Sequence, residues 1–170
     1  TYYSKFCLLQ IATPSLVACV DPLALEDIDS LLDIIYDTTV VKVFHSARQD
    51  LEIFYHLRGS LPTPVFDTQV AAPLLGFQDN PGYAMLVSSW LNVNLTKEHT
   101  RTDWSSRPLS EGQIAYAADD VIYLAEIYQR MLKKLTDLGR LTWLKDDFDH
   151  LSDVTVYQAN PELAWLKIRG

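Results

Sequence analysis

The 170-residue chain has few of the residues that build disulfide frameworks or zinc sites, and it has no long hydrophobic run. Its only cysteines, Cys7 and Cys19, are too few for a disulfide framework, and each lies in a short apolar segment. The four histidines show no ligand spacing with them, so no zinc site is expected. No apolar segment reaches the roughly 20 residues that a membrane-spanning helix needs. We therefore predict buried free thiols, a reducing cytoplasmic location and no membrane partner.

Positive charge is also scarce in this sequence. Its 14 Lys and Arg residues stand against 22 Asp and Glu residues, which gives a formal net charge of −8. Such a chain is a poor candidate for non-specific binding to a nucleic-acid duplex, because that binding depends on many cationic side chains. The charge does not exclude an enzyme that grips a few nucleotides at a strand end, where acid-held metal ions and a local basic patch neutralise the phosphates.

The chain does have enough apolar residues, 48% of the total, to build one hydrophobic core. A T-P-S turn signal at 13–15 joins two apolar segments, 6–12 and 16–20, and predicts a hairpin. Helical and strand patterns then alternate, which favours an α/β or α+β fold with a small mixed sheet. The predicted helices cover about 25–36, 46–57, 67–75, 83–91, 110–140 and 141–151, with short strands at 40–44 and 65–66.

The segment 110–140 is expected to be one long helix around which the domain is organised. Ser110 and Gln113 have the spacing of a capping box, and Gly139 is a plausible stop. Apolar side chains recur at three- and four-residue steps and predict a core-facing stripe through positions 114, 117 or 118, 121, 125, 128, 132 and 135. Tyr116 and Asp120 are four residues apart, so their side chains should lie together on a neighbouring face.

Two acidic residues lie where a catalytic site would need them. Asp50 falls in the first turn of the helix that follows the strand at 40–44, with Ser46 and Gln49 forming a second possible capping box. Taken alone, an acid there is better explained by the helix dipole, an interaction worth about 0.5 kcal/mol. Asp120 lies inside its helix, where Asp is unfavourable. The alternative for Asp119 and Asp120 is one solvated acid and one paired with a cation.

These segments resemble known motifs. Residues 45–51 (H-S-A-R-Q-D-L) are similar to the second motif of the DEDD-type 3′–5′ exonucleases, and residues 116–120 (Y-A-A-D-D) to the third, in its Tyr-x-x-x-Asp form. Many intervening segments resemble the ribonuclease D branch in the right order, so the resemblance covers nearly the whole chain. They include L-T-K at 95–97, R-T-D-W at 101–104, R-P-L at 107–109 and D-T-Q at 67–69.

The resemblance implies a fold, an activity and a set of site residues. The fold would be a ribonuclease-H-like mixed sheet flanked by helices. The activity would be 3′–5′ exoribonuclease cleavage that releases 5′-nucleotides from RNA 3′ ends, with tRNA precursors as candidate substrates. Two divalent ions, Mg²⁺ or Mn²⁺, would be held by Asp50 and Asp120, and Tyr116 would orient the attacking water. From the residues themselves, Lys97 and Arg107 are expected to contact the substrate, Trp104 is interpreted as structural and Asp67 as a helix N-cap.

The first motif of the family, Asp-x-Glu, does not occur at a suitable place, and the resemblance puts it shortly before Thr1 on a first strand. We therefore expect 1–152 to be an N-terminally incomplete exonuclease domain with little activity alone. Residues 153–170 should be a linker and the start of a C-terminal helical domain similar to the helicase-and-RNase-D C-terminal domain. A non-catalytic RNA-binding module of the same fold and a DNA 3′–5′ exonuclease remain the alternatives, and no oligomeric state is predicted.

Overall fold

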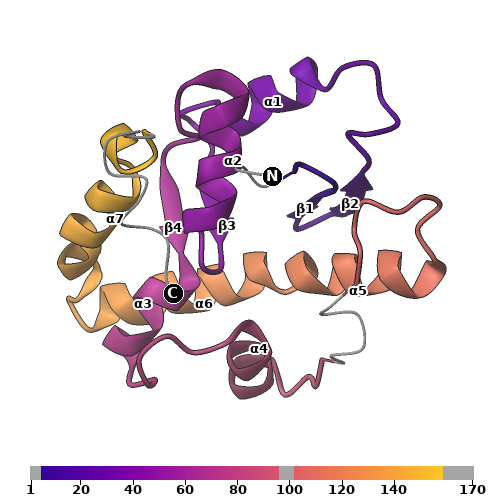
Figure 1. Ribbon diagram of the computed structural model, residues 1–170. Coiled ribbons are helices and arrows are strands. Elements are labelled where there is room, and N and C mark those ends of the chain that lie inside the picture. The colour runs from indigo at the N-terminus through magenta and orange to yellow at the C-terminus, as the bar shows by residue number, and fades with distance from the viewer. Residues whose placement is uncertain (1–4, 96–101, 159–170) are drawn as a thin grey trace, which may run out of the picture.

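The computed structural model describes residues 5–95 and 102–158, in which the strands form two small sheets (Figure 1). Strands β1 (Leu9–Thr13) and β2 (Leu16–Val20) pair as the predicted antiparallel hairpin, with Leu9 opposite Val20. Strands β3 (Lys42–Phe44) and β4 (Val65–Asp67) pair in parallel, with Phe44 opposite Asp67. The predicted mixed α/β architecture is confirmed, although the described strands make two separate sheets and not one.

Helices surround both sheets. The α-helices are α1 (Asp29–Ile35), α2 (Arg48–Arg58), α3 (Thr68–Ala71), α4 (Tyr83–Leu91), α5 (Glu111–Ile122), α6 (Leu124–Asp137) and α7 (Lys145–Leu151), and the 3₁₀ helices are η1 (Ala72–Leu75), η2 (Leu141–Leu144) and η3 (Val154–Val156). In Figure 1, α5 and α6 run end to end across the molecule, with α2 and both sheets on one side and α4 on the other. Within the described residues, no helix is long and apolar enough to cross a membrane.

The expectation of one continuous helix over 110–140 is wrong, because the helix is interrupted at Tyr123. That residue has φ −93° and ψ −10°, away from the helical values near −63° and −42°. The interruption changes which side chains face the core. The fully or nearly buried residues of α6 are Leu124, Ile127, Met131 and Leu135, and not the predicted positions 125, 128 and 132. The capping box of Ser110 and Gln113 does form, and Gly139 at φ 65° follows the end of α6 as expected.

The largest part of the core lies where α3, α4 and α6 meet. Its buried members are Phe66, Ala71, Ala72, Leu86, Val87, Ile127, Met131, Leu135 and Leu144. A second cluster under α2 includes Leu51 and the buried Tyr157, whose hydroxyl donates a hydrogen bond to the Leu151 carbonyl. Residues up to 157 therefore pack on the domain, whereas residues 159–170, where the C-terminal domain is predicted to begin, lie outside the described residues. Cys7 and Cys19 are free thiols, as predicted, but are half-buried.

The second predicted capping box, between Ser46 and Gln49, does not form. Ser46 has φ 65°, and α2 begins at Arg48 with no side-chain cap. The buried Asp67 carboxylate takes that role from a distance, because it accepts hydrogen bonds from the backbone N–H groups of Ser46 at 3.0 Å and Ala47 at 2.7 Å.

The same carboxylate also caps α3, as the sequence predicted for Asp67. It accepts from the backbone N–H groups of Gln69 at 2.8 Å and Val70 at 3.4 Å. One side chain that is 2% exposed thus satisfies donors at the start of two helices. Because buried N–H groups are costly to leave unpaired, Asp67 fixes the junction between β3 and α2.

Replacing Asp67 with alanine should destabilise the fold severely. Asp67→Ala removes an N-cap and leaves buried N–H groups unpaired, so the free energy of unfolding should fall by about 2–4 kcal/mol. Urea denaturation measures this change. The control is Asp153→Ala, which removes the cap of η3 at an exposed site and should have a much smaller effect. Equal losses for the two variants would contradict the role given to Asp67.

Candidate active site

A pocket of about 340 Å³ lies where β1, α2 and α5 meet, and it holds the three residues predicted to carry catalysis. Asp50 enters it from α2, and Tyr116 and Asp120 enter it from α5. The structure therefore brings together two carboxylates that lie far apart in the sequence. The remaining lining residues are Lys5, Phe6, Cys7, Leu8, Gln10, Ile53 and Trp104.

Local packing fixes the direction of both helices that supply these side chains. Leu51 is fully buried next to Asp50, so the first turn of α2 cannot rotate without exposing it. Ala117 is fully buried next to Tyr116, where α5 packs on the β1–β2 hairpin. The small alanine side chain allows α5 to approach the hairpin closely. The catalytic candidates are thus held by helix faces that are anchored in the core.

The electrostatic environment raises the pKa of both carboxyl groups. Burial, followed by the negative charge of Asp67, raises the pKa of Asp50 to about 6. Burial, followed by the neighbouring Asp119, raises the pKa of Asp120 to about 6. Solvent reaches both side chains from the pocket, but the surrounding protein disfavours the charged forms. A bound cation would remove that disadvantage, so the pair is suited to binding positive charge near neutral pH.

The donor set of the pocket fits a hard divalent cation. Asp50 and Asp120 offer carboxylate oxygens, which are the ligands that Mg²⁺ and Mn²⁺ prefer. In the part of the chain that the structure describes, no group of three or more His, Cys, Asp or Glu side chains is arranged to hold a metal ion. By themselves these two acids would supply only part of a coordination shell.

Further aromatic and polar side chains lie around the acids, and none of them was predicted as a site residue from the sequence. The ring of Trp104, interpreted as structural, lies in the pocket with its centroid 6.2 Å from that of Tyr116 and the two planes 31° apart. Lys5 and Gln10 also line the pocket. A lone lysine before the first strand and a glutamine within it carry no local signal of function, so only their three-dimensional placement identifies them.

Of the two cationic residues predicted to bind substrate, only Arg107 lies within the described residues. Lys97 lies outside the described residues. Arg107 uses all five of its N–H donors within the protein. Its Nε and Nη2 donate to the Asp21 carboxylate at 2.6 and 2.7 Å, and Nη2 also donates to the Cys7 carbonyl at 2.6 Å. Its Nη1 donates to the carbonyls of Trp104 at 2.9 Å and Ser106 at 2.7 Å.

These contacts give Arg107 a structural position that differs from the predicted one. The guanidinium joins the segment before β1, the end of β2 and the loop that carries Trp104. It has no N–H group left for a phosphate in this arrangement, so its contacts do not support a role in substrate binding.

The fold and the acid-lined pocket define the class of protein. A family model described as "3'-5' exonuclease" matches residues 1–136, and the chain belongs to this family. Among its members, the chain is similar to proteins named ribonuclease D. The protein of that name from Gluconacetobacter diazotrophicus is 49% identical over 173 residues, which cover 99% of this chain and 43% of the relative. The chain thus spans less than half the length of the curated relatives that it matches.

Solved structures confirm the ribonuclease-H-like fold expected from the resemblance. The crystal structure of Escherichia coli RNase D, described as "an exoribonuclease involved in structured RNA processing", matches with a TM-score of 0.89 and 35% identity. That match covers 98% of this chain and 44% of the E. coli chain. Brucella melitensis NrnC with bound Mg²⁺ matches with a TM-score of 0.78 and 26% identity, over 96% of this chain and 79% of NrnC.

The raised pKa values predict that the two acids cost stability at high pH. Each carboxyl has a pKa of 3.8 when unperturbed and about 6 in the fold, so the folded state loses stability as pH rises between these values. Asp50→Asn and Asp120→Asn should therefore raise the melting temperature at pH 8 in EDTA and leave it unchanged at pH 3.5. Thermal denaturation at both pH values measures the effect.

Asp37 is the control residue, and its substitution should change the melting temperature at pH 8 in the opposite direction. Hydrogen bonds from Thr39 lower the pKa of Asp37, so its charged form contributes stability above pH 3.8, which is lost as pH falls. Asp37→Asn should lower the melting temperature at pH 8. A decrease for the Asp50 and Asp120 variants at pH 8 would show that their carboxylates stabilise the metal-free fold, contrary to this expectation.

The Arg107 contacts predict strong coupling with Asp21. Arg107→Gln and Asp21→Asn should each lower the melting temperature, and the double variant should lose less than the sum, because both single changes break the same ion pair. Thermal denaturation of the parent, the two single variants and the double variant completes this double-mutant cycle. Additive losses would mean that the two side chains stabilise the fold independently.

Proposed function

We propose that this chain is the catalytic part of a metal-dependent 3′–5′ exoribonuclease that trims RNA 3′ ends and releases 5′-nucleotides. The observation that supports this most is the convergence of Asp50, Tyr116 and Asp120 in one pocket, on a chain of the 3′–5′ exonuclease family. Precursors of tRNA are the proposed natural substrates, consistent with relatives named ribonuclease D. The two free thiols fit a reducing, cytoplasmic location.

A divalent ion is part of this proposal, with Mg²⁺ or Mn²⁺ as candidates. When bound, such an ion acts as a Lewis acid that activates water and neutralises charge on the phosphate. Asp50 and Asp120 would hold it through their carboxylate oxygens. The Mg²⁺-bound NrnC structure, similar in fold, supports this assignment. Two carboxylates offer fewer oxygens than the six ligands that one such ion takes, so water, the substrate phosphate or further side chains would complete the shell.

Other side chains of the pocket would bind and orient the RNA end. The Tyr116 hydroxyl, one helical turn from Asp120, would orient the attacking water by a hydrogen bond. The Trp104 ring beside it offers a surface on which the terminal base can stack. Lys5 lines the same pocket and carries a positive charge for a phosphate. NrnC has been solved bound to pGG, which supports a short oligonucleotide as the kind of molecule that fits this fold.

Digestion of a 5′-end-labelled RNA by the full-length protein tests the proposal. Asp50→Asn and Asp120→Asn should lower the cleavage rate by more than about 100-fold, because each removes a charged ligand and weakens stabilisation of the reacting phosphate. Tyr116→Phe keeps the ring and removes only the hydroxyl, and should lower the rate by about 10- to 100-fold. Removing divalent ions with EDTA should abolish cleavage, and Mg²⁺ or Mn²⁺ should restore it.

Asp119→Asn is the matched control, because Asp119 is the neighbouring acid and does not line the pocket. Its rate should stay within about threefold of the parent, with the acidic limb of the pH profile moved to lower pH, because Asp119 helps to raise the pKa of Asp120. Equal rates for the parent and Asp120→Asn would reject the mechanism. RNA binding without cleavage would indicate a non-catalytic module, and preference for a DNA strand of the same sequence would indicate a DNA exonuclease.

A further inference from the structure

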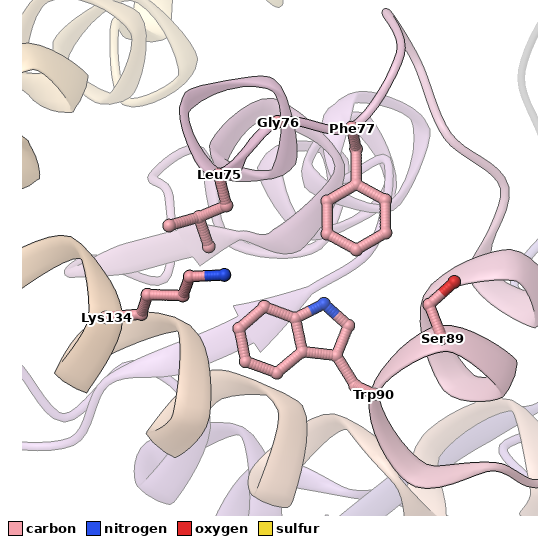
Figure 2. Close-up of a pocket in the computed structure, with 6 residues that line it drawn as sticks. All are labelled: Leu75, Gly76, Phe77, Ser89, Trp90 and Lys134. Carbon is pink, nitrogen blue, oxygen red and sulfur yellow. The ribbon is translucent and has the colours of Figure 1, made fainter.

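A second pocket, of about 360 Å³, lies between η1, α4 and α6 and has no role in the proposed chemistry (Figure 2). Its walls come from three segments that are distant in the sequence: the end of η1, the last turn of α4 and the last turn of α6. The lining residues are Leu75, Gly76, Phe77, Ser89, Trp90 and Lys134. This volume lies within the range of about 300–1,000 Å³ that is typical of small-ligand sites.

Two aromatic rings form a flat platform in this pocket. The rings of Phe77 and Trp90 are nearly parallel, 18° apart, with their centroids separated by 6.3 Å. That separation is near the upper end of the roughly 4.5–7 Å found for interacting aromatic pairs, so the two rings are loosely associated. Both residues are only half-buried. The platform can therefore accept a further planar group.

The indole nitrogen of Trp90 is a buried donor that has no hydrogen-bond partner among residues 5–95 and 102–158. A buried indole N–H normally finds an acceptor, and leaving one unpaired costs about 1–3 kcal/mol. Figure 2 shows this nitrogen on the ring edge that faces Leu75 and Phe77, toward the interior of the pocket. A small movement of the half-buried Phe77 ring would give a ligand acceptor access to it.

Lys134 adds a positive charge beside the rings. Its Nζ lies 5.5 Å from the centroid of the Trp90 ring, and Figure 2 shows the side chain extending over the same space. Among the described residues, Lys134 has no carboxylate within ion-pair distance, whereas its neighbour Lys133 pairs with Asp137 at 2.6 Å. In a chain with a net charge of −8, this unneutralised ammonium group next to an aromatic platform favours an anionic, aromatic ligand.

We propose that this pocket binds an unpaired nucleotide of the RNA substrate, upstream of the 3′ end held in the catalytic pocket. The base stacks on the rings of Phe77 and Trp90, the Trp90 N–H donates to a base acceptor, and Lys134 contacts a phosphate. This inference rests on the proposed exoribonuclease function. It assigns the second pocket as an RNA exosite that increases affinity for long substrates without taking part in cleavage.

The positions of the two pockets set a minimum substrate length. Lys134 follows Asp120 along the nearly continuous α5–α6 pair, and a rise of about 1.5 Å per residue places them about 21 Å apart along the axis. Figure 1 shows α4 on the opposite side of this pair from α2, so the RNA has to pass around the helix. With a rise of about 3.4 Å per nucleotide in a stacked strand, about six nucleotides are needed to cover this axial distance.

Kinetics of the full-length protein on 4- and 20-nucleotide RNAs test this exosite. Lys134→Gln should raise KM for the 20-mer by about 3- to 10-fold. It should also reduce the slope of log binding constant against log salt concentration by about one, because one phosphate contact is lost. Trp90→Phe keeps an aromatic ring but removes the N–H donor, and should raise the same KM by about 2- to 5-fold. For both variants, kcat and the KM for the 4-mer should match the parent. Lys133→Gln is the matched control and should leave KM and kcat unchanged for both RNAs.

Photo-crosslinking separates failure of the exosite from failure of the proposed function. A 20-mer carrying 5-iodouridine at single positions should crosslink to Trp90 only when the label lies six or more nucleotides from the 3′ end, with or without cleavage activity. Cleavage of both RNAs with unchanged KM values and no crosslink at Trp90 would overturn the exosite. Crosslinking at Trp90 in a protein that cleaves neither RNA would support the exosite and reject the nuclease. If binding of a protein partner shields Trp90 from solvent and binding of RNA does not, that result would also count against the RNA exosite.

Discussion

The Asp67 carboxylate is the interaction on which the candidate site most depends. It ends β4, caps α3 and accepts hydrogen bonds from Ser46 and Ala47 at the entry to α2. The parallel pairing of β3 with β4 places Phe44 opposite Asp67 and so brings this carboxylate to the beginning of α2. Asp50 lies in the first turn of α2, so its position follows from a hydrogen-bonding group that belongs to another part of the chain. The negative charge of Asp67 also contributes to the raised pKa of Asp50.

The site combines a rigid frame with acidic groups that the frame does not neutralise. Arg107 connects the segment before β1, Asp21 and the Trp104 loop through its five donors, and Ala117 lets α5 lie close to the hairpin. Asp50 and Asp120 have no cationic partner in the salt bridges of the described residues, although Lys5 lines the same pocket. Burial and neighbouring acids make their charged forms unfavourable, and a divalent cation would reverse this. Such an arrangement is typical of a site whose stability is completed by its ligand.

Features that depend on nearby residues could be predicted from the sequence, whereas features that depend on distant partners could not. The capping box of Ser110 and Gln113 forms because both partners lie within one helical turn. The similar pair Ser46 and Gln49 does not form one, because Asp67 satisfies the same kind of donor from 20 residues away or more. Arg107 has the residue type of a phosphate ligand, but its partners Asp21 and Cys7 come from the segments on either side of the β1–β2 hairpin. The interruption at Tyr123 likewise has no Pro or Gly to mark it.

The sequence by itself determined the order of helices and strands, the hairpin, the Asp67 cap and the motif residues Asp50, Tyr116 and Asp120. The elements and the cap follow from periodicity, turn chemistry and short-range spacing, which act over a few residues and so are visible in the linear chain. The motif residues were identified by their resemblance to the exonuclease motifs. Only the tertiary structure decided that Asp50 and Asp120 share a pocket, that Arg107 is used internally, and that Trp104 lines the site. It alone also brought Phe77, Trp90 and Lys134 together. The physical reason is that hydrogen-bond satisfaction and packing are decided by whichever groups meet in space, and residues far apart in the chain supply those groups here.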